Sequence, residues 1–276
     1  MFTCRRLVLV VSLLLFVAPS WVSAQLRKLD ETGKHFAHKF ESAKHHPAVV
    51  AVADFTSTDS TLAPQSHYLS WYLSGAIQAD GMDSLRVADH LKFDDDIKTI
   101  KKSSDPSLAL QSVSQFLPYI GGDFLVVGTI ERHGSSFALN LHALRVSDAT
   151  EIHSESVEIA TSPFLESLSA PAQSPSEKPP QIPGTNGIGM PSCPNAPDPS
   201  YTDLARTLKI KGVLTVSGII SANGTIQNIR PVKMLGYGLD EQAYKTIKQW
   251  KCKPALDKEG NAVPVLVPIE VSFRLY

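Results

Sequence analysis

Residues 263–276 read VPVLVPIEVSFRLY, and this stretch decides the fold of the last part of the chain. The apolar positions recur at every second residue: Val265, Val267, Ile269, Val271, Phe273 and Leu275. Successive side chains of a β-strand point to opposite faces of the sheet. The period of two therefore predicts a strand with one face in a core.

A hairpin precedes this strand. Residues 213–221 alternate in the same way, and Asn223-Gly224 is a strong turn signal because both residues tolerate positive φ. The return strand, residues 225–234, contains Pro231, and proline is confined to sheet edges and bulges. The apolar phase also changes within this strand, which favours a bulge.

Two helices are predicted around the hairpin. Residues 239–250 carry apolar side chains at helical spacing, and Pro254 forbids continuation. These side chains are Leu239, Ala243, Ile247 and Trp250. A shorter helix is expected over residues 201–208.

Several of these positions form a spaced set of motifs across residues 201–276. They are Tyr201, Ala205-Arg206, Gly212-Val213, Asn223-Gly224, Leu239-Asp240, the run WKCKP at 250–254 and the final strand. In this set the chain resembles the TonB C-terminal domain family, with the TolA C-terminal domain as the neighbouring alternative. The resemblance implies two helices on a three-stranded antiparallel sheet. It also implies that a sheet edge captures a peptide of an outer-membrane receptor by strand addition.

The chain departs from the family pattern at three places. Thr202 stands where the family often has proline, and threonine can still begin a helix. Cys252 replaces an aromatic residue that would fill core. Residues 7–18 lack the polar histidine of a typical TonB anchor, so the resemblance does not carry over energy coupling.

Cys252 leaves two readings open. In one, Cys193 and Cys252 form a disulfide that fixes the end of the linker to the last domain. Closing such a loop would stabilise the fold by roughly 4 kcal/mol. In the other, Cys252 is a buried free thiol and Cys193 is loose.

The final strand carries a prediction of its own about the binding edge. Pro264 and Pro268 share a parity and have no N–H to donate, so their side of the strand is the expected unpaired edge. A guest strand would then find donors only further along. The predicted partner-binding residues are Glu270, Val271, Ser272, Phe273 and Arg274. The alternative is that the prolines merely block edge aggregation.

The start of the chain has the three parts of an export signal. Arg5 and Arg6 are followed by an apolar run and by the small residues before Gln25, which predicts a signal peptide over residues 1–24. The expected location is the periplasm of a bacterial cell envelope. The alternative is an inner-membrane protein anchored by residues 7–22, although the apolar run is shorter than the roughly 20 residues of a spanning helix.

Residues 26–161 predict an α/β or α+β layered domain, and together with the last domain they predict the α+β class for the chain. A helix, the apolar run 48–55, further helices at 67–78 and 106–119, and a short strand at 85–88 precede a meander. The strands of that meander are 123–132, 136–146 and 151–159. The strand sequences VAVADF (50–55) and GDFLVVGTI (122–130) resemble the N-terminal domain of TolB and the FlgO and CsgG group of envelope proteins.

Residues 162–199 form a linker rich in proline and serine. Such a composition has too little to bury and favours extended polyproline geometry. It predicts either a spacer for the last domain (residues 200–276) or an inert tether, and both imply independent domain motion.

Composition and motifs exclude several classes of function. A formal net charge of −1 gives no argument for nucleic acid as a partner. No Walker loop, dinucleotide fingerprint, His-Glu-x-x-His or Gly-x-Ser-x-Gly motif occurs, so we predict no enzyme, catalytic residue or cofactor. The best metal candidates are the histidines 35, 38, 45 and 46, the acidic run 94–96 and the pair His142/His153. Solvated polar faces explain them better, and we predict no metal.

These observations favour an exported envelope protein that binds a peptide segment of an outer-membrane receptor or another envelope protein by strand addition. One alternative is a membrane-anchored TonB energy transducer for transport through outer-membrane receptors. Another is an envelope assembly or structural protein, and a homodimer through the same edge is a further expectation.

Overall fold

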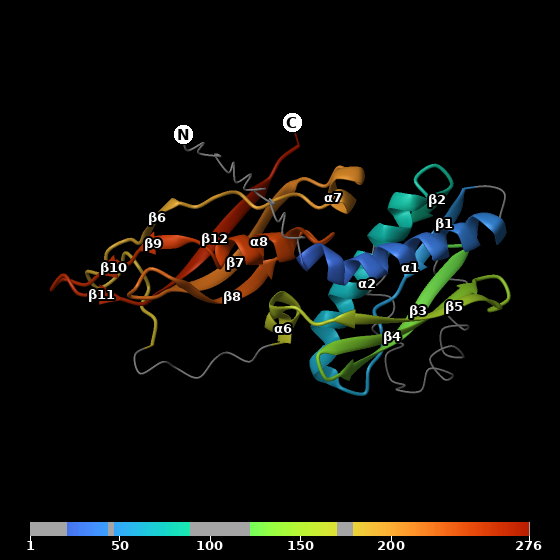
Figure 1. The fold of residues 1–276 in the computed structure, drawn as a ribbon, viewed down its shortest axis with the longest axis horizontal. Helices are drawn as coiled ribbons and strands as arrows, with labels where there is room; N and C mark the ends of the chain where they lie inside the picture. The colour runs from blue at the N-terminus through green and yellow to red at the C-terminus, as the bar shows by residue number, and fades with distance from the viewer. Residues whose placement is uncertain (1–20, 44–46, 89–121, 170–178, 276) are drawn as a thin grey trace, which may run out of the picture.

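The computed structural model describes residues 21–43, 47–88, 122–169 and 179–275 (Figure 1). Most of the predicted signal peptide, the expected helix at 106–119, the acidic run 94–96 and His45 and His46 lie outside these residues. The described chain forms two larger sheets, of five and three strands, with helices packed on them, and two further sheets of two strands each. This confirms the α+β class.

The first domain is built on a five-stranded sheet in the order β2-β1-β3-β4-β5. β1 pairs in parallel with β2 and β3, and β3, β4 and β5 form an antiparallel meander. The strands are β1 (Ala48–Val52), β2 (Leu85–Val87), β3 (Phe124–His133), β4 (Ser136–Arg145) and β5 (Glu151–Ala160). Their positions follow the predicted runs closely, because each run is bounded by turn residues.

Two long helices, α1 (Trp21–Ala43) and α2 (Ala63–Asp80), pack on each other and on this sheet (Figure 1). Gly33 lies where they approach, and a Cβ there would come within 2.5 Å of the Cβ of Ala76. The glycine costs helix propensity, but it allows the close contact between the helices. The described part of the domain also contains the short helices η1 (Ser60–Leu62) and α6 (Pro163–Ser169).

The last domain is a three-stranded antiparallel sheet in the order β12-β7-β8, with two helices. Its elements are α7 (Asp203–Thr207), β7 (Gly212–Ile220), β8 (Ile226–Lys233), α8 (Leu239–Ile247) and β12 (Val265–Phe273). The Thr202 side chain accepts a hydrogen bond from the backbone N–H of Ala205 and begins α7 as expected. The register of β8 shifts at two points, which confirms the bulge.

Some boundaries differ from the predictions. α8 ends at Ile247. Trp250, the last apolar position of the predicted helix, lies beyond this end, and its N–H donates to the carbonyl oxygen of Ile247 in a turn. β12 ends at Phe273, and Leu275 is partly exposed. Four short strands were not predicted: β6 (Ser192–Asn195), β9 (Lys251–Lys253), β10 (Ala255–Leu256) and β11 (Ala262–Val263).

The second half of the predicted linker packs against the last domain. We call residues 179–199 the strap. Ile188 of the strap is only 7% exposed and joins the core of the last domain. β6 of the strap pairs with β9, and Gln181 bridges to Val265. This part of the linker is therefore not the extended spacer that its proline content predicts, because backbone pairing and one buried side chain hold it.

The two domains contact each other, which differs from the expected independence. The ring of Tyr237 lies 5.7 Å from that of Trp71 on α2, and Phe164 on α6 lies 6.0 Å from Tyr244 on α8. A Cβ at Gly75 of α2 would come within 2.5 Å of the Tyr237 ring. Glycine at this position therefore lets the aromatic ring lie directly on the helix.

Two carboxyl groups at the start of α8 are buried in this region. Asp240 accepts hydrogen bonds from the backbone N–H groups of Leu235 and Gly236, at 3.0 and 2.6 Å. Glu241 is 2% exposed and accepts one from the Ser162 hydroxyl of the first domain, at 3.2 Å. Burial raises the pKa of Asp240 to about 6 and that of Glu241 to about 8, and the charge of Asp240 adds to the second shift.

We predict that Glu241 makes the stability of the protein depend on pH. Between about pH 4.5 and about pH 8, folded Glu241 holds a proton that the unfolded chain has released. The free energy of unfolding therefore falls as the pH rises through this window. E241Q keeps a neutral side chain of the same size and removes this dependence.

Urea denaturation of the wild type and E241Q at both ends of the window measures the effect. E241Q should gain stability relative to the wild type as the pH rises. The titration of Asp240 contributes to the pH dependence of both proteins and cancels to first order in their difference. Equal pH slopes for the two proteins would contradict the buried, protonated Glu241.

Candidate partner-binding edge

The sheet of the last domain has two edges, and they differ in regularity. β8 contains Pro231, two register shifts and Asn228 with a φ of 51°, and α6 lies against it. β12 pairs with β7 over nine consecutive residues without a shift. A regular strand presents its outer backbone groups in one line, so β12 is the edge that suits strand addition.

The outward side of β12 is defined by its contact with the strap. The N–H of Leu266 donates to the carbonyl oxygen of Gln181, and the N–H of Gln181 donates to that of Pro264, each at 2.9 Å. Backbone groups of residues two apart point the same way along a strand. The even-numbered residues of β12 therefore direct their N–H groups away from β7, on the side that the proline positions predict.

This parity assigns a direction to each predicted binding residue. Glu270 and Ser272 direct their N–H groups outward and have exposed side chains. Val271 and Phe273 are 4% and 2% exposed and hold the strand on the core. Arg274 is exposed and follows the last residue of the strand.

Phe273 is held from the other side of the core. The ring of Tyr201 meets it edge-on at 5.2 Å, and the guanidinium of Arg206 lies 5.3 Å from the centre of the Tyr201 ring. The Tyr201 hydroxyl donates to the carbonyl oxygen of Ile210. These contacts fix the end of β12 where the predicted guest strand would pair.

The start of the same edge is occupied. Within the described part of the chain, Gln181 is the one residue bridged to the outer side of β12. Pro268 follows the bridged stretch and has no N–H. The outward donors within β12 that remain beyond it are those of Glu270 and Ser272.

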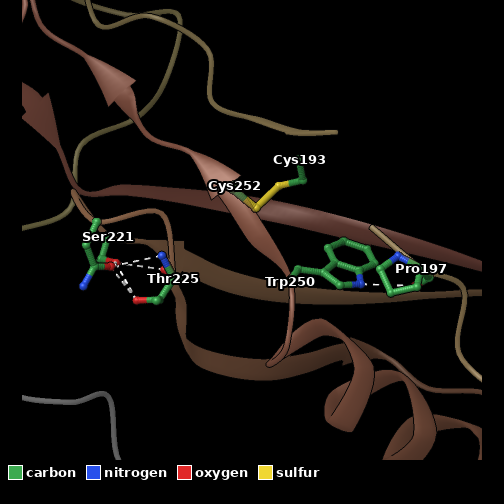
Figure 2. Close-up of a disulfide and its surroundings, with 7 residues drawn as sticks. Cys193, Pro197, Ser221, Thr225, Trp250 and Cys252 are labelled. Carbon is green, nitrogen blue, oxygen red and sulfur yellow. Dashed lines mark hydrogen bonds between the residues drawn. A yellow bond between two sulfur atoms is a disulfide. The ribbon is translucent and has the colours of Figure 1, made fainter. Parts of the chain in front are cut away.

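Cys193 and Cys252 are joined by a disulfide, with their Cα atoms 4.1 Å apart (Figure 2). The bond links β6 of the strap to β9. Next to it, the indole Nε1–H of Trp250 donates to the carbonyl oxygen of Pro197 at 3.2 Å. The backbone N–H of Cys252 donates to the carbonyl oxygen of Gly224 in the hairpin turn. The disulfide thus joins the strap to β9, next to the hairpin turn of the last domain.

The described metal candidates pair with carboxylates. These pairs are His35 with Glu155, His38 with Glu41, and His142 with Glu151. His142 and His153 do not meet, because His153 lies opposite Ala143 and so faces the other side of the sheet. No group of three or more potential metal ligands occurs among the described residues.

Sequence reasoning missed two features of this region. One is Gln181, which lies in a proline-rich segment without any periodic signal. The other is the burial of Asp240 and Glu241, whose positions at a helix start are typical of exposed residues that favour the helix dipole. Only the contact with the first domain makes Glu241 a buried group.

Residues 197–275 match the family model of the Gram-negative bacterial TonB protein C-terminal, which confirms the resemblance of the last domain to this family. No curated protein matches the sequence of the chain. In the described part of the chain, none of the helices combines the length and apolar character needed to cross a membrane.

Three solved structures are among those that the chain matches. The LpoB C-terminal domain from Salmonella enterica shares 14% identity at a TM-score of 0.34 and covers 51% of this chain and 98% of its own. Lipoprotein GNA1162 from Neisseria meningitidis shares 14% identity at a TM-score of 0.32, and the match covers 42% of this chain and 83% of the lipoprotein. The TonB C-terminal domain from Pseudomonas aeruginosa shares 19% identity at a TM-score of 0.27, and the match covers 33% of this chain and 90% of that domain.

We predict that Cys193 and Cys252 are oxidised in the mature protein and that the bond stabilises it. C193S should lower the free energy of unfolding by about 2–5 kcal/mol, because a loop spanning 59 residues is no longer closed in the unfolded chain. Urea denaturation of both proteins measures the loss. Thiol counting under denaturing, non-reducing conditions is the direct check, and free thiols at both positions would contradict the prediction.

Proposed function

We propose that this chain is an envelope protein whose TonB-like last domain captures an extended segment of a partner protein by strand addition at β12. The observation that carries the proposal is the outward direction of the N–H groups of Glu270 and Ser272 on a regular, unbulged edge strand. A guest strand there would gain affinity from backbone hydrogen bonds and specificity from its side chains.

The exposed side chains of the edge suit a polar guest. Glu270 and Arg274 carry opposite charges on either side of Ser272. A guest with a basic residue beside Glu270 and an acidic residue beside Arg274 would pair with both, since opposite charges on neighbouring strands are favourable. We propose that this pattern sets the register of the guest.

The location in the envelope is part of the proposal. Residues 1–24 are proposed to be removed as an export signal, and the alternative is an anchor over residues 7–22 of an energy transducer. Sequencing the N-terminus of the mature protein separates the two. A start at Gln25 supports the exported form, and an intact N-terminus supports the transducer.

A second candidate function, envelope assembly, is favoured by the contact between the domains. The Tyr237–Trp71 and Phe164–Tyr244 contacts and the Ser162–Glu241 hydrogen bond hold the β12 edge in a defined place relative to the first domain. Such an arrangement suits a protein that places a partner beside its first domain. Deleting residues from Pro197 onward and following where the first domain localises tests this role.

We predict that S272P strongly weakens capture of the partner, whereas S272A does not. Proline removes the outward N–H of residue 272, and Pro268 on the same side of β12 shows that proline is compatible with this edge. Alanine removes the side chain and keeps the donor. Loss of a backbone hydrogen bond together with the clash of the proline ring should weaken binding by about tenfold or more.

The measurement is affinity capture of envelope proteins by the full mature chain, compared among the wild type, S272A and S272P. Equal melting temperatures of the three proteins control for folding. Undiminished capture by S272P would rule out pairing at this edge. A dimer of the chain that S272P dissolves would instead identify a second copy as the guest.

A further inference from the structure

The strap already behaves as a strand added to β12. Gln181 pairs in parallel with Val265 through two backbone hydrogen bonds, which is the geometry expected of a guest. The strap then turns away, because the N–H of Gly184 donates to the carbonyl oxygen of Ile188 and closes a loop. Ile182, the residue after the bridge, is 64% exposed.

Few noncovalent contacts hold the strap near Gln181. Ile188 is the buried apolar residue of its first half, and the N–H of Gly189 donates to the carbonyl oxygen of Leu256. Met190 is 72% exposed. Ordering such a segment costs backbone entropy at every residue, and the Cys193–Cys252 bond reduces that cost by keeping the strap beside the domain.

We propose that the strap is a redox-controlled cover of the partner-binding edge. With the disulfide formed, Gln181 occupies the edge at Pro264–Leu266 and confines a guest to the part beyond Pro268. With the disulfide reduced, the first half of the strap, residues 179–190, leaves β12, and the edge is open from Pro264 to Arg274. This inference rests on the proposed function, because it concerns the regulation of the same edge.

The reductant is a dithiol. Its thiolate attacks the Sγ atom of Cys193, which is the more exposed of the two cysteines, and forms a mixed disulfide while Cys252 leaves as a thiolate. The second thiol of the reductant then attacks the mixed disulfide and releases Cys193. Two electrons pass to the protein, which ends with two thiols, and the dithiol ends as a disulfide.

Opening exposes backbone groups that a guest can use. Leu266 regains an outward N–H and Pro264 a free carbonyl oxygen. Leu266 also presents a side chain that is 45% exposed beside the freed edge. A longer guest that spans Pro268 could therefore pair on both sides of the proline.

Hydrogen exchange of the full mature chain, without any partner, tests the release of the strap. The amide of Leu266 should exchange at least tenfold faster after reduction with dithiothreitol, and C193S/C252S should match the reduced protein. The amide of Val267 is the internal control, because it points toward β7 and should not change. Equal exchange of Leu266 in both forms would overturn the proposal, and so would a parallel rise at Val267.

Capture of envelope proteins by the oxidised chain and by C193S/C252S tests the effect on binding. The variant should capture at least tenfold more of a partner whose capture S272P weakens. Equal capture by the two forms would show that the strap does not control partner binding, and would overturn the proposal. If neither form captures a partner, the proposed function is wrong, while the exchange of Leu266 still reports separately whether the strap is released.

Discussion

The alternation of β12 is the constraint on which the last domain depends. Its odd-numbered side chains, such as Val271 and Phe273, fill the core, while its even-numbered residues direct their N–H groups away from β7. A shift of one residue would expose the core face and exchange the two sets of donors. The same pattern therefore fixes the fold and selects the backbone groups that a guest strand can reach.

The strap and the first domain restrict this edge from two directions. The strap covers the start of β12 through Gln181 and is tied to the domain by the Cys193–Cys252 bond. The first domain contacts the helical side of the last domain through α2 and α6. Glu241 of the last domain is buried against the first domain, where it accepts a hydrogen bond from Ser162. The edge is thus one surface of a larger packed arrangement.

Local patterns predicted the elements well where a single face or turn decides the structure. The meander of the first domain and the Asn223-Gly224 hairpin follow from alternation and turn residues, and the bulge in β8 follows from Pro231. The structure of the linker is predicted less well from the sequence, because proline content indicates only a local preference for extended backbone. An extended segment is also what pairs with a sheet edge, and composition does not distinguish pairing from solvation.

By itself, the sequence determined the α+β class, the TonB-like character of the last domain and the side of β12 on which the prolines lie. Periodicity and proline parity are local properties, and they survive whatever surrounds the strand. Only the tertiary structure decided that Gln181 occupies the start of this edge, that Cys193 lies beside Cys252 and that Glu241 is buried. Each of these depends on residues distant in the sequence meeting in space, and no local pattern encodes such a meeting.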